Sequence, residues 1–176
     1  MKHKNMSYPD SIEYLAKQAG MDPQKGVIQN PNYVEKDFSS LRKIMIEVNN
    51  YYKSHLKNNM HVKKYLDGRN ITNKTIEKFE LGYSSNLGND LFNFLKSKDI
   101  KIDDAVSLGL IKKSNRNEQN YYDFFRNRLM FPIKDYKSNI IAFGGRTLDN
   151  SIIKYINSSD SPIFKKSYHL FNLDVA

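Results

Sequence analysis

The stretch that decides the fold is YYDFFRNRLMFPIKD at 121–135, followed by IIAFGGRTL at 140–148. In both stretches apolar residues recur at every second position. They are Leu129, Phe131, Ile133, Ile141 and Phe143. Side chains of a strand point alternately to its two faces, so this period predicts two strands. The turn-forming run DYKSN between them predicts an antiparallel hairpin, and Pro132, which lacks an N–H group, predicts an edge strand or a bulge there.

Apolar residues ahead of the hairpin recur at helical spacing instead. The strongest pattern lies at 34–57, where a stripe stepping by three and four residues predicts one long helix. The stripe consists of Val34, Phe38, Leu41, Met45, Val48 and Tyr52. Shorter helices are expected at 7–20, 61–69, 72–81, 89–98 and 102–111, and another begins near 167.

Two further segments complete the outline of the chain. Residues 21–33 hold two prolines and a glycine, which favour a linker, and 152–157 predict another short strand. A helical amino-terminal part followed by a small antiparallel sheet predicts an α+β fold.

The charge balance is basic, with 28 Lys and Arg against 19 Asp and Glu among 176 residues. Residues 112–166 carry 11 basic and 5 acidic side chains, mixed with Tyr and Phe, which suits a phosphate backbone with stackable bases. A surface that only keeps the protein in solution is the alternative. The absence of cysteine excludes disulfides, thiol catalysis and thiolate zinc sites, and no apolar run is long enough for a transmembrane helix.

Five basic residues of this region are candidate ligands for phosphate. Arg126 and Arg128 would share a face if FRNR is extended, and Arg146 follows two glycines that let a backbone approach a ligand. Lys154 precedes a tyrosine, and Lys166 follows Phe-Lys. Taken singly, each is also explained as a solvated charge or as an arginine beside a glycine bulge.

The acids of the same region stand singly. They are Glu118, Asp123, Asp135, Asp149 and Asp160. Metal-dependent phosphoryl transfer uses two or three clustered carboxylates, and this region shows no such acidic cluster.

Several motifs, in order, resemble the bacterial DnaG-type DNA primase family. They are YLDGRNITNKTIEKFELGYSS, YYDFFRNRLMFPIKD, IIAFGGRTLD, KYINS and PIFKKSYHLFNLDVA. The resemblance implies the amino-terminal, basic half of the RNA polymerase catalytic core, truncated before the Toprim half. It also implies that residues 1–20 end a zinc-binding module, 21–33 are a linker and 34–176 are the core subdomain.

The resemblance further implies that Arg126, Arg128, Arg146, Lys154 and Lys166 contact single-stranded DNA template or ribonucleoside triphosphate. No catalytic or metal-binding residue is expected in this chain, since the Mg²⁺ (or Mn²⁺) and Zn²⁺ ligands of the full-length family member would lie elsewhere. Arg69 matches a family arginine and is expected to be structural. A cytoplasmic location in the bacterial replisome, no contact with membrane, and the replicative helicase as a partner of the full-length protein are implied as well.

The parent function would be the synthesis of short RNA primers for DNA replication, with the isolated segment inactive. One alternative is a non-catalytic module that binds single-stranded nucleic acid. Another is a basic structural domain that binds acidic protein partners.

Overall fold

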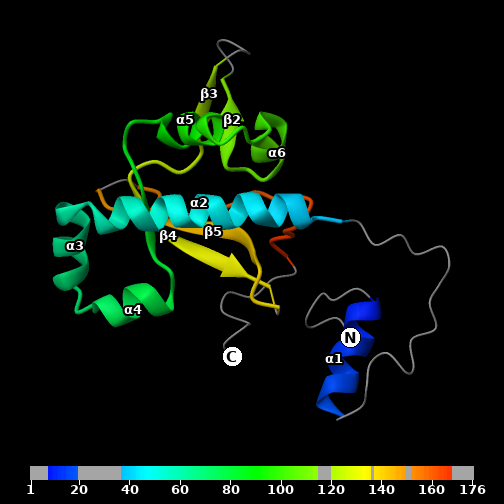
Figure 1. Cartoon of the computed structure of the whole chain (residues 1–176). Coiled ribbons are helices and arrows are strands. Elements are labelled where there is room, and N and C mark those ends of the chain that lie inside the picture. Colours follow the sequence, from blue (N-terminus) through cyan, green and yellow to red (C-terminus); the bar gives the residue numbers. More distant parts are fainter. Residues whose placement is uncertain (1–7, 20–36, 115–119, 136, 150–151, 168–176) are drawn as a thin grey trace.

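The computed structural model of the chain describes residues 8–19, 37–114, 120–135, 137–149 and 152–167. Its helices are α1 (Tyr8–Gln18), α2 (Ser39–Lys57), α3 (Met60–Asp67), α4 (Asn73–Lys78), α5 (Asp90–Ser97) and α6 (Ile102–Ser107). Its strands are β1 (Gly82–Ser84), β2 (Ile111–Lys113), β3 (Tyr121–Asp123), β4 (Arg128–Lys134), β5 (Ile140–Thr147) and β6 (Tyr155–Asn157). The strand pairs are antiparallel and helices dominate the amino-terminal part, so the predicted α+β fold is confirmed (Figure 1).

The predicted hairpin is formed by β4 and β5, at the centre of a four-stranded sheet of order β1-β4-β5-β6. The carboxylate of Asp135 closes its turn by accepting hydrogen bonds from the backbone N–H groups of Lys137 and Asn139, each at 2.9 Å. The strand predicted within 152–157 is β6, on the other side of β5.

The prediction for Pro132 holds only locally, because β4 is an interior strand rather than an edge strand. The partner strand β1 pairs with Arg128–Met130 and stops before Pro132. The N–H group that proline lacks is therefore not needed for a hydrogen bond to β1. The pairing with β5 also becomes irregular close by, because its register shifts between Ile133 and Lys134.

Helix α2 follows the predicted stripe but begins at Ser39, later than expected. The Asp37 carboxylate accepts hydrogen bonds from the backbone N–H of Ser39 at 2.8 Å and from its hydroxyl at 3.1 Å. Such a local bond offers the backbone an alternative to the helix. Val34 and its neighbours lie outside the described residues, and the rest of the stripe except the half-buried Phe38 is buried.

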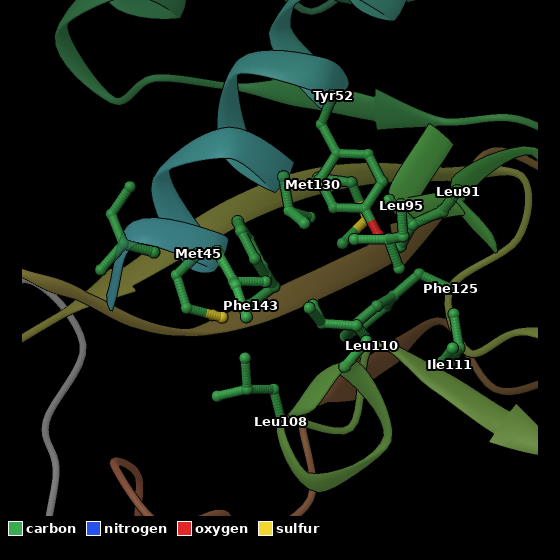
Figure 2. Packing of buried hydrophobic residues seen from close by; sticks show 14 of the residues in the cluster. Met45, Tyr52, Leu91, Leu95, Leu108, Leu110, Ile111, Phe125, Met130 and Phe143 are labelled. Carbon is green, nitrogen blue, oxygen red and sulfur yellow. The ribbon is translucent and has the colours of Figure 1, made fainter. Parts of the chain in front are cut away.

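The β4–β5 hairpin has two faces, because side chains alternate along each strand. The face that α2 covers, here called the α2 face, carries Met130, Phe143 and Gly145. Tyr52 of α2 meets Phe143 edge-on with ring centroids 5.4 Å apart, and Figure 2 shows this packing. The opposite face, the outer face, carries Leu129 and Arg146, which are paired in the register.

A close approach between α2 and β1 fixes the helix on the sheet. A Cβ atom added at Gly82 would lie 2.5 Å from the Cβ of Tyr52 and 2.8 Å from its carbonyl carbon. Since no side chain fits at that distance, glycine is required at this position.

The four short helices after α2 are confirmed as α3 to α6, but each is shorter than expected. Residues 82–84 and 111–113 are strands, although the sequence predicts no strand there, and β2 pairs with β3 in a second, two-stranded sheet. Three-residue strands show too little periodicity to be recognised. Asp123 of β3 connects this second sheet to α5, because its carboxylate accepts hydrogen bonds from the backbone N–H groups of Leu91 and Phe92 at 3.0 Å each.

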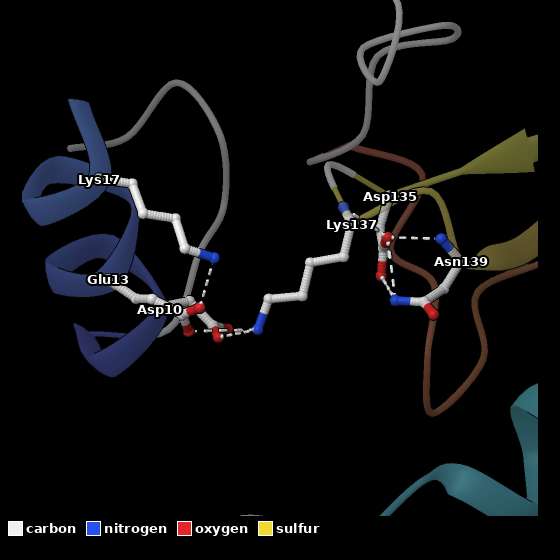
Figure 3. Close-up of polar contacts among 6 residues, drawn as sticks. All are labelled: Asp10, Glu13, Lys17, Asp135, Lys137 and Asn139. Carbon is white, nitrogen blue, oxygen red and sulfur yellow. Dashed lines mark hydrogen bonds and ion pairs between the residues drawn. The ribbon is translucent and has the colours of Figure 1, made fainter. Parts of the chain in front are cut away.

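Helix α1 confirms most of the helix predicted at 7–20, and lies near the β4–β5 turn (Figure 3). The Lys137 ammonium is 2.9 Å from Asp10 and 3.8 Å from Glu13. The predicted linker at 21–33 and the helix expected after 167 lie outside the described residues. No helix in the described ranges is long and apolar enough to span a membrane.

Candidate nucleic-acid interface

A group of cationic and aromatic residues lies where β5 pairs with β6, with Arg146 on the outer face and Lys154 immediately before β6. We call this group, Arg146, Lys154 and Tyr155 together with Tyr65 of α3, the β5–β6 end. Arg146 and Tyr155 are direct partners in the register. The Arg146 guanidinium lies 5.6 Å from the ring centroids of both Tyr155 and Tyr65 and donates a hydrogen bond to the Tyr65 hydroxyl. Two aromatic rings therefore hold this positive charge in place.

The charge of Arg146 is not neutralised inside the fold. Within the described ranges no carboxylate forms an ion pair with it, and its buried Nε has no hydrogen-bond partner there. A bound anion would satisfy this charge.

Arg69 contacts the same tyrosine as Arg146. Its side chain is exposed, and its guanidinium is 4.9 Å from the centroid of the Tyr65 ring. The ring of Tyr65 therefore has two guanidinium groups, those of Arg69 and Arg146, within cation–π distance. The structural role expected for Arg69 stays a prediction.

Arg128 is used differently, although it comes from the same hairpin. Strand alternation places it on the α2 face with Met130, opposite Arg146. Its guanidinium donates hydrogen bonds to the backbone carbonyls of Gly145, Ile153 and Lys154, each at 3.3 Å. Burial lowers the pKa of Arg128, an effect that the charge of Asp149 partly opposes.

Arg126 lies in the loop before β4, beside the two-stranded sheet. It is exposed, and its guanidinium is 5.4 Å from the Tyr122 ring centroid. On the same sheet, the Lys112 ammonium lies 4.4 Å from the Phe124 ring centroid. These contacts form a second cationic and aromatic group, separate from the contacts of Arg146.

The two candidate lysines are exposed. Lys154 immediately precedes Tyr155, and its carbonyl accepts a hydrogen bond from Thr147 at 2.9 Å. The backbone N–H of Lys166 donates to Asp160 at 2.9 Å, which fixes its main chain but leaves its ammonium in solvent. The structure therefore brings Arg146 and Lys154 to one end of the sheet and does not gather all five predicted residues there.

The acids near these cations are engaged in local structure. Asp149 accepts a hydrogen bond of 2.5 Å from the Thr147 hydroxyl and one of 3.2 Å from Asn127. Asp123 is buried against α5, and this burial raises its pKa although two backbone N–H groups favour its charged form. Their partners hold these two acids in place, and neither acid forms an ion pair with Arg146 or Lys154 in the described ranges.

The part of the chain that the structure describes contains no group of three His, Asp or Glu side chains able to hold a metal ion. What the β5–β6 end offers is noncovalent: a guanidinium and an ammonium for phosphate, and tyrosine rings for stacking.

Sequence reasoning missed Tyr65 and Tyr155 as members of the site. Tyr155 stands next to Lys154 in the quoted KYINS motif, but its pairing with Arg146 depends on the strand register. Tyr65 lies 81 residues before Arg146, and no local pattern links them. Its place in the YLDGR motif, next to a basic residue, was the available signal.

Comparisons with known proteins agree on one family. Residues 51–176 match the family model for the DNA primase catalytic core, N-terminal domain. The DNA primase of Clostridium acetobutylicum is 37% identical over 100% of this chain and 29% of its own length. That of Deinococcus radiodurans is 33% identical over 98% of this chain and 29% of its own length. The chain thus spans less than a third of these relatives.

Solved structures give the same result. The structure of a DnaG primase catalytic domain bound to single-stranded DNA has a TM-score of 0.69 and 28% identity, covering 77% of this chain and 44% of that one. The Aquifex aeolicus primase, with its zinc-binding and RNA polymerase domains, has a TM-score of 0.71 and 31% identity, covering 97% and 40%. The chain therefore belongs to the bacterial DnaG-type DNA primase family and corresponds to the amino-terminal domain of its catalytic core.

Proposed function

We propose that this chain serves a DNA primase by holding the single-stranded template at the β5–β6 end and by helping to position a ribonucleoside triphosphate. The parent reaction would join ribonucleotides into a short RNA primer for DNA replication. The isolated chain would bind without synthesising. Its proposed division is the end of a zinc-binding module at 1–20, a linker at 21–33 and the core subdomain at 34–176.

One observation carries the proposal. Arg146 has no carboxylate partner among the described residues, and its guanidinium lies close to two tyrosine rings. One of these rings belongs to Tyr155, which follows the exposed Lys154. Single-stranded nucleic acid presents phosphates and stackable bases at short intervals, which is the combination that this end can contact. The relative bound to single-stranded DNA supports the same kind of ligand.

The other predicted residues have proposed roles that follow from their positions. Arg126, beside the two-stranded sheet, and Lys166, beyond β6, would contact phosphates further along the strand or on the triphosphate. Both side chains are exposed and lack an ion-pair partner in the described ranges. Their contribution would be long-range and salt-dependent.

Fluorescence anisotropy with a labelled oligothymidine tests the proposal on the full chain. Arg146→Ala and Lys154→Ala are each expected to weaken binding about tenfold and to lower the slope of log affinity against log salt by about one. Lys43→Ala, an exposed lysine on α2, is the matched control and should bind as wild type does. Wild-type affinity in both test variants would contradict the proposal, as would primer synthesis by the isolated chain.

A further inference from the structure

Arg128 was predicted to contact nucleic acid, but its contacts fit another task. Its guanidinium donates to three carbonyls that lie on two segments, Gly145 of β5 and Ile153 and Lys154 just before β6. One side chain thus ties the segment entering β6 to the strand that carries Arg146. A fork of fixed donors is suited to such a bridge, because it reaches several acceptors at once.

The second glycine of the GGR motif makes room for this bridge. A Cβ atom added at Gly145 would lie 3.0 Å from the Cδ atom of Arg128 and 2.8 Å from the ring of Phe125. Glycine at this position therefore lets the Arg128 side chain cross β5. This is a physical reason for the glycine that does not involve a ligand.

The segment that Arg128 holds has few other attachments. Ile152 is 99% exposed and Ile153 60% exposed, so neither is anchored by burial. The strand β6 is three residues long, and one further backbone bond, from Thr147 to the Lys154 carbonyl, precedes its ladder. Edge segments of this kind open easily unless side chains hold them.

We propose that Arg128 is a positioning residue, which holds the backbone at 153–154 so that Lys154 and Tyr155 stand at the β5–β6 end, and that it does not contact the strand itself. This inference rests on the proposed binding of single-stranded DNA. Three of its donors are used by carbonyls, and it lies on the face opposite Arg146.

A double-mutant cycle distinguishes positioning from direct contact. Arg128→Gln is expected to weaken oligothymidine binding about tenfold in the wild-type chain and to have no further effect when Lys154 and Tyr155 are both alanine. Arg126→Gln, the matched control from the same motif, should weaken binding equally in both backgrounds. A tenfold loss for Arg128→Gln in both backgrounds would overturn the proposal.

A second variant covers the case in which Arg128→Gln fails to fold. Arg128→Lys keeps the charge but cannot reach three carbonyls, so it should lose affinity as Arg128→Gln does. Near wild-type affinity in Arg128→Lys would show that charge alone matters and would contradict positioning.

Hydrogen exchange separates this inference from the proposed function, because it needs no DNA. Amides at 154–157 should exchange about tenfold faster in Arg128→Lys than in wild type and stay unchanged in Lys154→Ala. Unchanged exchange in Arg128→Lys would overturn the positioning role even if the chain binds DNA. Faster exchange in a chain that binds no DNA would retain the role and reject the binding.

Discussion

The two ends of the β4–β5 hairpin treat positive charge in opposite ways. At the turn end, Lys134 lies 2.7 Å from Glu80, and Lys137 lies 2.9 Å from Asp10. At the β5–β6 end, neither Arg146 nor Lys154 has a carboxylate partner in the described ranges. The hairpin therefore carries paired cations at its turn end and, in Arg146, a cation without a carboxylate partner in the described ranges at its other end.

This difference separates cations that have a carboxylate partner from cations that have none in the described ranges. A cation paired with a carboxylate contributes little to an external field, because the two opposite charges largely cancel, as they do for Lys134 and Glu80. A cation without a carboxylate partner repels other cations nearby, and a bound polyanion would relieve this repulsion. The comparison makes separate predictions for stability and for binding.

The largest expected effect comes from neutralising the β5–β6 end. Arg146→Gln combined with Lys154→Gln should weaken binding of labelled oligothymidine about 100-fold, since each lost contact costs about 1.4 kcal/mol. Lys137→Gln at the turn end is the matched control and should leave the anisotropy titration unchanged. Comparable losses at both ends would erase the distinction between them.

The reverse pattern is expected when the turn end is altered. Lys134→Met removes the ammonium that pairs with Glu80, whose other oxygen accepts a 2.7 Å bond from Asn49. The free energy of unfolding should fall by about 1–2 kcal/mol, because the partly buried carboxylate loses a charged donor. Urea denaturation measures this loss. A fall in oligothymidine affinity with an unchanged free energy of unfolding would contradict the assignment of Lys134 to stability.

The same pair gives a pH dependence. Burial works to raise the pKa of Glu80, but the hydrogen bond and charge of Lys134, with smaller contributions from Lys53 and Asn49, together lower the pKa below its usual 4.5. A carboxyl with a lowered folded-state pKa stabilises the protein above its unfolded pKa, and this contribution is lost as the pH falls through the folded one. The stability difference between wild type and Lys134→Met, measured by urea denaturation, should therefore shrink below pH 4.5. A difference that is constant across this range would count against the pairing.

The smallest effect is expected where α1 meets the turn. Lys137→Ala removes an exposed ion pair with Asp10, so stability should fall by about 0.2–1 kcal/mol at low salt and by less at high salt. Thermal unfolding at two salt concentrations measures it. Lys17→Ala, which breaks a pair within α1, controls for loss of helix stability.

The central elements of the fold could be predicted because each has its own local signal. Period-two apolar residues identified β4 and β5, and the long stripe identified α2. The strands β1, β2 and β3 could not be recognised, since three residues carry no reliable period. Asp123 illustrates this limit. Its carboxylate accepts hydrogen bonds from two N–H groups of α5, and it lies in β3, a strand with no signal of its own in the sequence.

The candidate site was predictable in composition but not in arrangement. Arg146 and Lys154 were named from their motifs, and their role in binding stays a prediction. Which face each basic residue occupies depends on register, and register separates Arg128 from Arg146. The carbonyls that bind Arg128 come from strand pairing, so the sequence offered no sign of its bridging contacts.

The most direct test of the account is to map oligothymidine onto the whole chain by amide chemical-shift changes. The account predicts the largest changes at 144–147 and 154–157, with little change in the turn at 134–138. Changes concentrated in that turn, or no saturable change anywhere, would contradict the claim that the unpaired cations form the interface.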